Sequence, residues 1–201
     1  MHCSSCSGGV CSGKDSDVEQ PSSQRPDVLT LSFAVTYWDY LGWKDSFGKP
    51  EFTDRQRVYE PALGERGPYT PQMVVNGRTT AVGNNLSEVD GLIQGTTPNG
   101  GPTISLGQDN VDIGTGTGPE ASADVWLVRY DPHTLQVDII RGENGGRTLA
   151  HRNIVKELTR LGDWTGAATR FTLPPGSDSG LQIAILVQGK HGGPILAALK
   201  A

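Results

Sequence analysis

Large apolar residues alternate with small or polar ones in several short stretches of the chain. In residues 29–35 the alternating positions Leu29, Leu31, Phe33 and Val35 predict a strand that lies inside a sheet. Further short apolar runs recur at regular spacing in the second half, which is typical of a small β-sandwich or barrel. These runs predict strands at 103–107, 110–115, 123–130, 135–141 and 181–188.

One helix is predicted to begin at Thr53, because Thr53 can cap it and Gln56 occupies the capping-box position. This helix is predicted to end near Gly64, and Pro61 in its last turns favours a short or kinked helix. Residues 154–161 are ambiguous, since their apolar spacing fits both a helix and a bent strand.

A hairpin is predicted over residues 73–82, because Asn76-Gly77 is a preferred dipeptide of type I′ turns. A second helix is predicted to follow it, capped by Asn85 together with Glu88. The first half of the chain is therefore expected to mix helices and strands.

The Gly- and Pro-rich residues 96–102 are the best linker candidate in the chain. We therefore expect an irregular or disordered Cys/Ser/Gly-rich segment at 1–25 and a mixed α/β domain at 26–95. A β-rich domain is expected to follow the linker, at 103–201.

The composition excludes several classes of protein. The 201 residues include 17 basic and 22 acidic side chains, a net charge of −5, so the basic surface that binds nucleic acid is not expected. No apolar run reaches the ~18 residues of a membrane-spanning helix, so no membrane span is expected. Residues 1–20 lack the charged and apolar regions of a signal peptide. The 27 glycines and 13 prolines fit a chain rich in strands and turns.

All three cysteines lie near the start of the chain, as Cys3, Cys6 and Cys11. Cys3 and Cys6 form a Cys-x-x-Cys motif, whose two sulfurs can meet in a tight turn and exchange a disulfide. A tail without function is an equal alternative from this motif alone. A zinc site that adds His2 and Cys11 is a weaker alternative, because structural zinc sites draw two ligand pairs from separate elements.

Two further features are candidates for the functional site. Thr70-Pro71 comes directly before the strand that opens the predicted hairpin, where a proline is an ordinary way to begin a strand. An aromatic block follows the strand at 29–35, and its rings either pack in the core or form an exposed platform for a peptide or small ligand. The aromatic candidates are Tyr37, Trp38, Tyr40 and Trp43.

Residues 37–45, 55–57, 69–77 and 141–148 resemble the corresponding blocks of the DUF1223 family, and the likeness runs over 26–201. That family comprises bacterial, usually secreted, proteins with a thioredoxin-like domain. The resemblance implies a redox site made by the Cys-x-x-Cys and the Thr-Pro. The chain departs from the family pattern in that the strand ahead of the Cys-x-x-Cys is expected to be missing and the helix after it is replaced by a Ser/Gly-rich run.

The resemblance therefore implies an α/β plus β fold: a thioredoxin-like N-terminal domain that lacks its first strand, followed by a β-rich, sandwich-like C-terminal domain. It implies a thiol–disulfide oxidoreductase-like protein of the periplasm or the secreted fraction. Cys3 would be the nucleophile and Cys6 the resolving thiol, and Thr70 and Pro71 would form a wall that positions the substrate. No cofactor or metal is implied, and the expected partner is a protein or a small thiol or disulfide. The alternative is a non-catalytic binding or scaffold module with vestigial cysteines.

Overall fold

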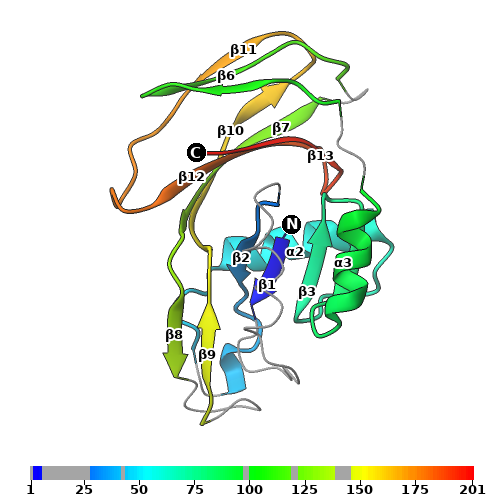
Figure 1. The fold of residues 1–201 in the computed structure, drawn as a ribbon, viewed down its shortest axis with the longest axis vertical. Coiled ribbons are helices and arrows are strands. Elements are labelled where there is room, and N and C mark those ends of the chain that lie inside the picture. Colours follow the sequence, from blue (N-terminus) through cyan, green and yellow to red (C-terminus); the bar gives the residue numbers. More distant parts are fainter. Residues whose placement is uncertain (1, 6–27, 42–43, 97–99, 119–121, 139–145) are drawn as a thin grey trace.

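The computed structural model describes residues 2–5, 28–41, 44–96, 100–118, 122–138 and 146–201 (Figure 1). These ranges contain two α-helices, α2 (Pro50–Leu63) and α3 (Leu86–Gln94), and the short 3-10 helix η1 (Asp39–Leu41). All other regular structure in these ranges is strand. The strands are β1 (His2–Ser5), β2 (Leu31–Ala34), β3 (Gln72–Val75), β4 (Thr79–Val82), β5 (Ile104–Leu106), β6 (Asn110–Ile113), β7 (Ala123–Asp131), β8 (Leu135–Asp138), β9 (Thr148–His151), β10 (Ile154–Trp164), β11 (Thr169–Thr172), β12 (Gln182–Gly189) and β13 (Ile195–Lys200).

One curved sheet of eight strands runs through the molecule in the order β13-β12-β7-β10-β2-β1-β3-β4. Its N-terminal and C-terminal strands are joined where Ile154 of β10 pairs in parallel with Ser32 of β2. A three-stranded sheet, β11-β6-β5, and a two-stranded sheet, β8-β9, complete the described strands.

The expected fold class is therefore wrong. The described chain is mostly β, with a half-barrel sheet and smaller sheets, and it is not a thioredoxin-like α/β domain followed by a sandwich-like domain. The physical reason is that strands pair through backbone hydrogen bonds, which form equally well between strands that are near or far apart in the sequence. Strand β10, from the second half of the chain, can therefore pair with β2 and join the sheet that contains β1.

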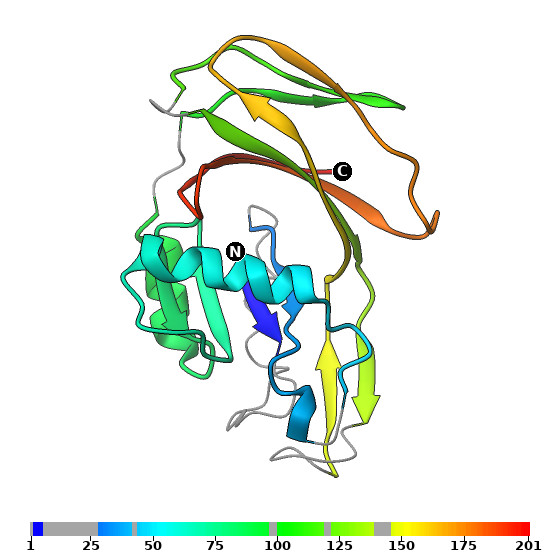
Figure 2. The same ribbon diagram turned by 180° about the vertical axis from the view of Figure 1, so that it is seen from behind.

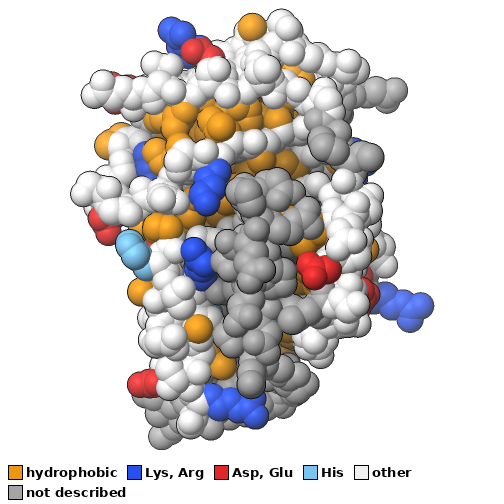
Figure 3. Space-filling model, viewed as in Figure 1, with side chains coloured by type: hydrophobic (Ala, Val, Ile, Leu, Met, Phe, Trp, Pro, Cys, Tyr) orange, Lys and Arg blue, Asp and Glu red, His pale blue; other side chains and the backbone are white. Residues whose placement is uncertain are grey.

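Three hydrophobic clusters hold these layers together. Helix α2 crosses one face of the sheet (Figure 2), where Phe52 meets Phe33 of β2 edge to face at 5.2 Å between ring centroids. A second cluster, which includes the fully buried Trp164, fills the space between the three-stranded sheet and strands β7, β10 and β12. Figure 3 shows hydrophobic side chains gathered in that region. Helix α3 packs on the β3–β4 hairpin through Met73 and Val89.

The first predicted helix ends as expected but begins earlier than expected. Its last residue is followed by Gly64 in the left-handed conformation, with φ of 71°. It begins at Pro50, whose ring fixes a helical φ, and Lys49 precedes it without a side-chain cap. Thr53 is therefore not a cap: it is buried inside the helix, and its hydroxyl accepts a hydrogen bond from the backbone N–H of Thr36 at 2.9 Å.

The hairpin and the second helix are confirmed. Asn76 and Gly77 both have positive φ, 52° and 63°, between β3 and β4. Asn85 caps α3, since its Oδ1 accepts from the backbone N–H of Glu88 at 3.2 Å. Residues 154–161 form a strand with register shifts between Val155 and Glu157 and between Arg160 and Gly162. Of the two alternatives, the bent strand is the one observed.

The expectation that the strand carrying the Cys-x-x-Cys is missing is also wrong. Strand β1 contains Cys3 and lies between β2 and β3, parallel to the first and antiparallel to the second. A central strand is held by backbone hydrogen bonds on both edges, so a short sequence with few apolar residues can still occupy it. Residues 6–27, which hold most of the expected irregular segment, lie outside the described residues, as do 97–99 of the expected linker.

Candidate functional site

The sheet brings Cys3 close to the Thr70-Pro71 pair. Cys3 on β1 lies opposite Met73 on β3, two residues after Pro71. Neighbouring strands are about 4.8 Å apart, so the Cys3 backbone lies beside the start of β3. Because β1 and β3 are antiparallel, the chain leaves β1 at the same end of the sheet at which Thr70-Pro71 enters β3. Cys6, the second predicted catalytic cysteine, lies outside the described residues.

Pro71 is fixed by its neighbours on the hairpin. The Thr70-Pro71 peptide bond is cis, and Pro71 is buried. The carbonyl oxygen of Pro71 accepts a hydrogen bond from the backbone N–H of Gly83 at 2.8 Å. A Cβ atom on Gly83 would lie 3.1 Å from the Cβ of Pro71, so the small residue allows this close approach.

A chain of hydrogen bonds ties α2 to the same end of the hairpin. The Nε2 of Gln56, which is 1% exposed, donates to the carbonyl oxygen of Tyr69 at 2.7 Å and to Oε1 of Gln72 at 3.0 Å. The Nε2 of Gln72 then donates to the hydroxyl of Thr80, which is bonded to the Tyr69 hydroxyl. The segment that carries Thr70 is therefore held from both the helix and the second strand of the hairpin.

Tyr37, in the segment after β2, lies near Gln56 and Thr70. Burial raises the pKa of Tyr37, and hydrogen bonding from Gln56, Thr70 and Trp38 opposes part of that effect. The negative charge of Glu60 raises the pKa of Tyr37 further. The hydroxyl is therefore protonated at neutral pH and can donate one hydrogen.

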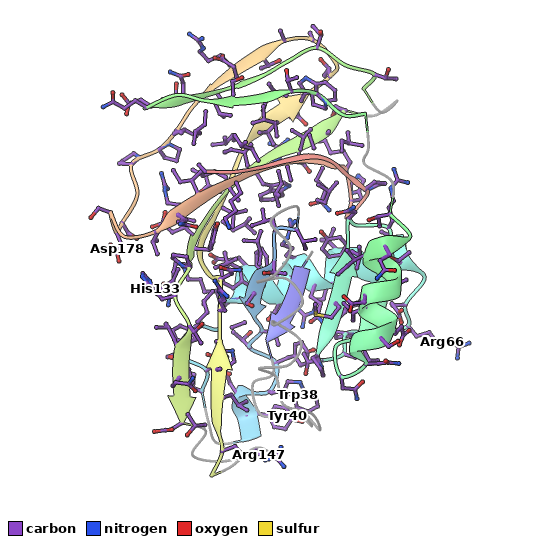
Figure 4. The ribbon with its side chains drawn as sticks, in the orientation of Figure 1. Trp38, Tyr40, Arg66, His133, Arg147 and Asp178 are labelled. Atoms are coloured by element: carbon purple, nitrogen blue, oxygen red, sulfur yellow. The ribbon has the colours of Figure 1, made fainter. Side chains whose placement is uncertain are left out.

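The other aromatic candidates form a stack that reaches the surface. The ring of Trp38 lies 5.6 Å from that of Tyr37 and 6.1 Å from that of Tyr40, measured between centroids. Tyr40 is 76% exposed, whereas Tyr37 and Trp38 are half-buried. Figure 4 shows Trp38 and Tyr40 next to each other at the end of the molecule toward which β1 points. Trp43 lies outside the described residues.

The sequence patterns missed the contribution of α2. Thr53, Gln56 and Glu60 follow one another at spacings of three and four residues, so they lie on one face of the helix. Thr53 and Gln56 were interpreted only as a helix cap. The sequence does contain a signal for this helix face: polar residues alternate there with the large apolar residues Phe52 and Tyr59, which are buried. Buried polar side chains need hydrogen-bond partners, so such a face is expected to contact other polar groups.

Metal ligands can be assigned only in the part of the chain that the structure describes. Among the described residues no three His, Cys, Asp or Glu side chains are grouped as metal ligands. The weaker zinc alternative depended on Cys6 and Cys11, which lie outside the described residues, so it stays untested. Within the described parts of the chain, no helix is long and apolar enough to span a membrane.

Comparison with known proteins assigns the chain to a family. The family model described as "Protein of unknown function (DUF1223)" matches residues 2–188, and the chain belongs to that family. A crystal structure of a protein from Agrobacterium tumefaciens is similar over 99% of this chain and 91% of its own, with 29% sequence identity and a TM-score of 0.77. The comparison with curated proteins finds no match.

Proposed function

We propose that this protein is a thiol–disulfide oxidoreductase-like protein of the bacterial cell envelope, with Cys3 as nucleophile and Cys6 as resolving thiol. The observation that carries the proposal is the register of β1 and β3, which pairs Cys3 with Met73, two residues after Pro71. Because β1 and β3 are neighbours in the sheet, the backbone at Cys3 lies near the segment that carries Thr70-Pro71, and an extended substrate bound along that segment would lie near Cys3. The cell-envelope location comes from the family resemblance.

The proposed exchange needs only the two thiols. The thiolate of Cys3 attacks one sulfur of a substrate disulfide, the substrate S–S bond breaks, and the departing sulfur takes up a proton. The thiolate of Cys6 then attacks the Cys3 sulfur of the mixed disulfide and releases the second substrate thiol. The Cys3–Cys6 dithiol is thereby oxidised by two electrons, and the substrate disulfide is reduced to two thiols. The same steps run backward when the substrate is the dithiol.

Insulin reduction by the full chain, with dithiothreitol as terminal reductant, tests this function. We expect the Cys3→Ser variant to lose the protein-dependent rate and the Cys11→Ser variant to keep it, because only the first removes the attacking thiol. Equal rates for the parent protein and the Cys3→Ser variant would contradict the redox role. A parallel loss in both variants would contradict the proposed exchange between Cys3 and Cys6, because that exchange does not use Cys11.

A second function, a non-catalytic binding module, is favoured by the exposure of Tyr40 in the stack with Trp38. An exposed ring of this size is a common anchor in protein interfaces. If binding is the function, Tyr40→Ala will weaken capture of a partner and Cys3→Ser will not. Tyr40→Leu is the matched control for lost apolar area, since it keeps bulk and removes the aromatic face.

A further inference from the structure

Gln56 on α2 binds both residues that flank the Thr70-Pro71 pair. Its Nε2 donates to the carbonyl oxygen of Tyr69 at 2.7 Å and to Oε1 of Gln72 at 3.0 Å. The side chain of Gln56 is buried, so water competes little for these two hydrogen bonds. One amide group therefore fixes the chain on both sides of Thr70-Pro71.

Strand pairing by itself does not fix where this pair lies. Cys3 on β1 pairs with Met73, and β3 begins only at Gln72. Thr70-Pro71 precedes the strand, so the hydrogen bonds between β1 and β3 do not hold it. The position of the pair relative to Cys3 therefore depends on bonds from outside the ladder, and the two bonds from Gln56 are among them.

The same network continues into the second strand of the hairpin. The Nε2 of Gln72 donates to the hydroxyl of Thr80 at 3.2 Å, and the hydroxyls of Thr80 and Tyr69 lie 2.7 Å apart. Loss of the Gln56 amide would release the carbonyl of Tyr69 and the side chain of Gln72 at the same time. Polar groups that lose a partner move toward another one, so the segment between them would shift.

We infer that Gln56 is a positioning residue, which sets the affinity for an extended substrate by holding Thr70-Pro71 near Cys3. This inference rests on the proposed function. The segment would contact the substrate equally before and during the attack by the thiolate, so a shifted segment should raise KM and leave kcat nearly unchanged. Alkylation of Cys3 by iodoacetamide should not change, because that reagent reports the thiol itself and is too small to use the segment.

The test compares the parent protein with Gln56→Met and Gln188→Met, in insulin reduction over a range of insulin concentrations. Methionine keeps the length of glutamine and removes both N–H donors. Gln188 is the matched control because it is also buried, and its Nε2 also donates to one side-chain oxygen and one backbone carbonyl. These acceptors are the Tyr59 hydroxyl and the carbonyl oxygen of Gly193, both at 2.9 Å, and neither belongs to the segment at 69–72.

We expect Gln56→Met to raise KM at least about fivefold with kcat within about twofold of the parent value, and Gln188→Met to leave KM unchanged. An unchanged KM in Gln56→Met, or an equal rise in both variants, would overturn the inference while the proposed function stands. A slower alkylation of Cys3 in Gln56→Met would also overturn it, since Gln56 would then act on the thiol. A parent protein that does not reduce insulin would contradict the proposed function and this inference together.

Thr80→Val is a milder second variant, and urea denaturation reports whether each variant folds. Valine keeps the size of Thr80 and removes the hydroxyl that binds Gln72 and Tyr69. It should raise KM by about twofold or more and leave the alkylation of Cys3 unchanged. If Gln56→Met does not fold, a parent-like KM in Thr80→Val refutes the inference.

Discussion

The backbone at Gly77 lies so close to the carbonyl oxygen of Gly193 that a Cβ atom on Gly77 would be only 2.5 Å from that oxygen. The turn of the β3–β4 hairpin thus packs directly on the loop between β12 and β13. A hydrogen bond from the N–H of Ile195 to the carbonyl oxygen of Asn76, at 2.9 Å, fixes the same contact. A local turn therefore anchors two distant parts of the chain.

Gly77→Ala should lower the free energy of unfolding by about 1–3 kcal/mol, because the new Cβ meets backbone and φ at Gly77 is +63°. Urea denaturation measures the change. Gly91→Ala is the opposite control: no heavy atom lies within 4 Å of its ideal Cβ, and it lies within α3. It should raise stability by up to about 1 kcal/mol. Equal effects of the two substitutions would contradict the close contact at Gly77.

Thr53→Val should destabilise the protein by about 1–3 kcal/mol, since it removes the hydroxyl that accepts from the backbone N–H of Thr36. Valine keeps the size of the side chain, so the loss reports the hydrogen bond rather than a cavity. Thr53→Ser keeps the hydroxyl and loses one methyl group, about 0.8 kcal/mol. Both free energies come from urea denaturation, and a valine variant as stable as the serine variant would show that the Thr36 bond contributes little.

His151 should make the protein less stable as the pH falls. Burial lowers the pKa of His151, and the negative charge of Asp45 opposes part of that effect. The unfolded chain therefore takes up a proton near pH ~6.5 that the folded protein resists. The contribution of His151 is complete above this pH and decreases below it. Urea denaturation at about pH 7.5 and about pH 5.5 measures the decrease.

His151→Gln should reduce that dependence on pH. His191→Asn provides the control, because His191 is exposed and asparagine tolerates its positive φ of 54°. The control variant should keep the slope of the parent protein. A parent slope retained after His151→Gln would mean that another group is responsible.

Asp163 should titrate far below an ordinary aspartate. Hydrogen bonds from Lys190 and then from Arg160 lower the pKa of Asp163 to about 2. Because the folded pKa lies below the unfolded value of ~3.9, the stabilisation is present above pH ~3.9 and is lost as the pH falls toward about 2. An NMR titration of the side-chain carboxyl carbon should show this midpoint. Lys190→Met should move it upward, and a parent midpoint near ~3.9 would contradict the ion pairs.

Features that depend on neighbouring residues could be predicted from the sequence. The Asn76-Gly77 turn, the Asn85 cap and the Gly64 helix end are all set by the backbone preferences or short side-chain bonds of adjacent residues. The start of α2 could not be predicted in this way. The local sequence around Thr53 is typical of a helix cap, but the Thr53 hydroxyl accepts a hydrogen bond from the backbone N–H of Thr36, seventeen positions away in the chain.

The candidate site, too, was predicted from the sequence only in part. Its residue types were visible in the sequence: the cysteines, the Thr-Pro pair and the aromatic block. The face of α2 that lies against them, with Gln56 and Glu60, was not, because it is defined by contacts with Tyr37 and Tyr69 across the fold. Strand β1 was likewise missed, as its backbone pairs with both neighbours whatever its side chains are.

The sequence by itself determined the Asn76-Gly77 turn, the end of α2, the cap of α3, most of the strands and the family to which the chain belongs. Only the tertiary structure decided that Ile154 pairs with Ser32, which makes one curved sheet of the two halves, and that Cys3 lies beside the strand that follows Pro71. The physical reason is that local preferences arise from sterics and hydrogen bonds within a few residues. Strand pairing uses identical backbone groups everywhere, so its partners are selected by the packing of the whole chain.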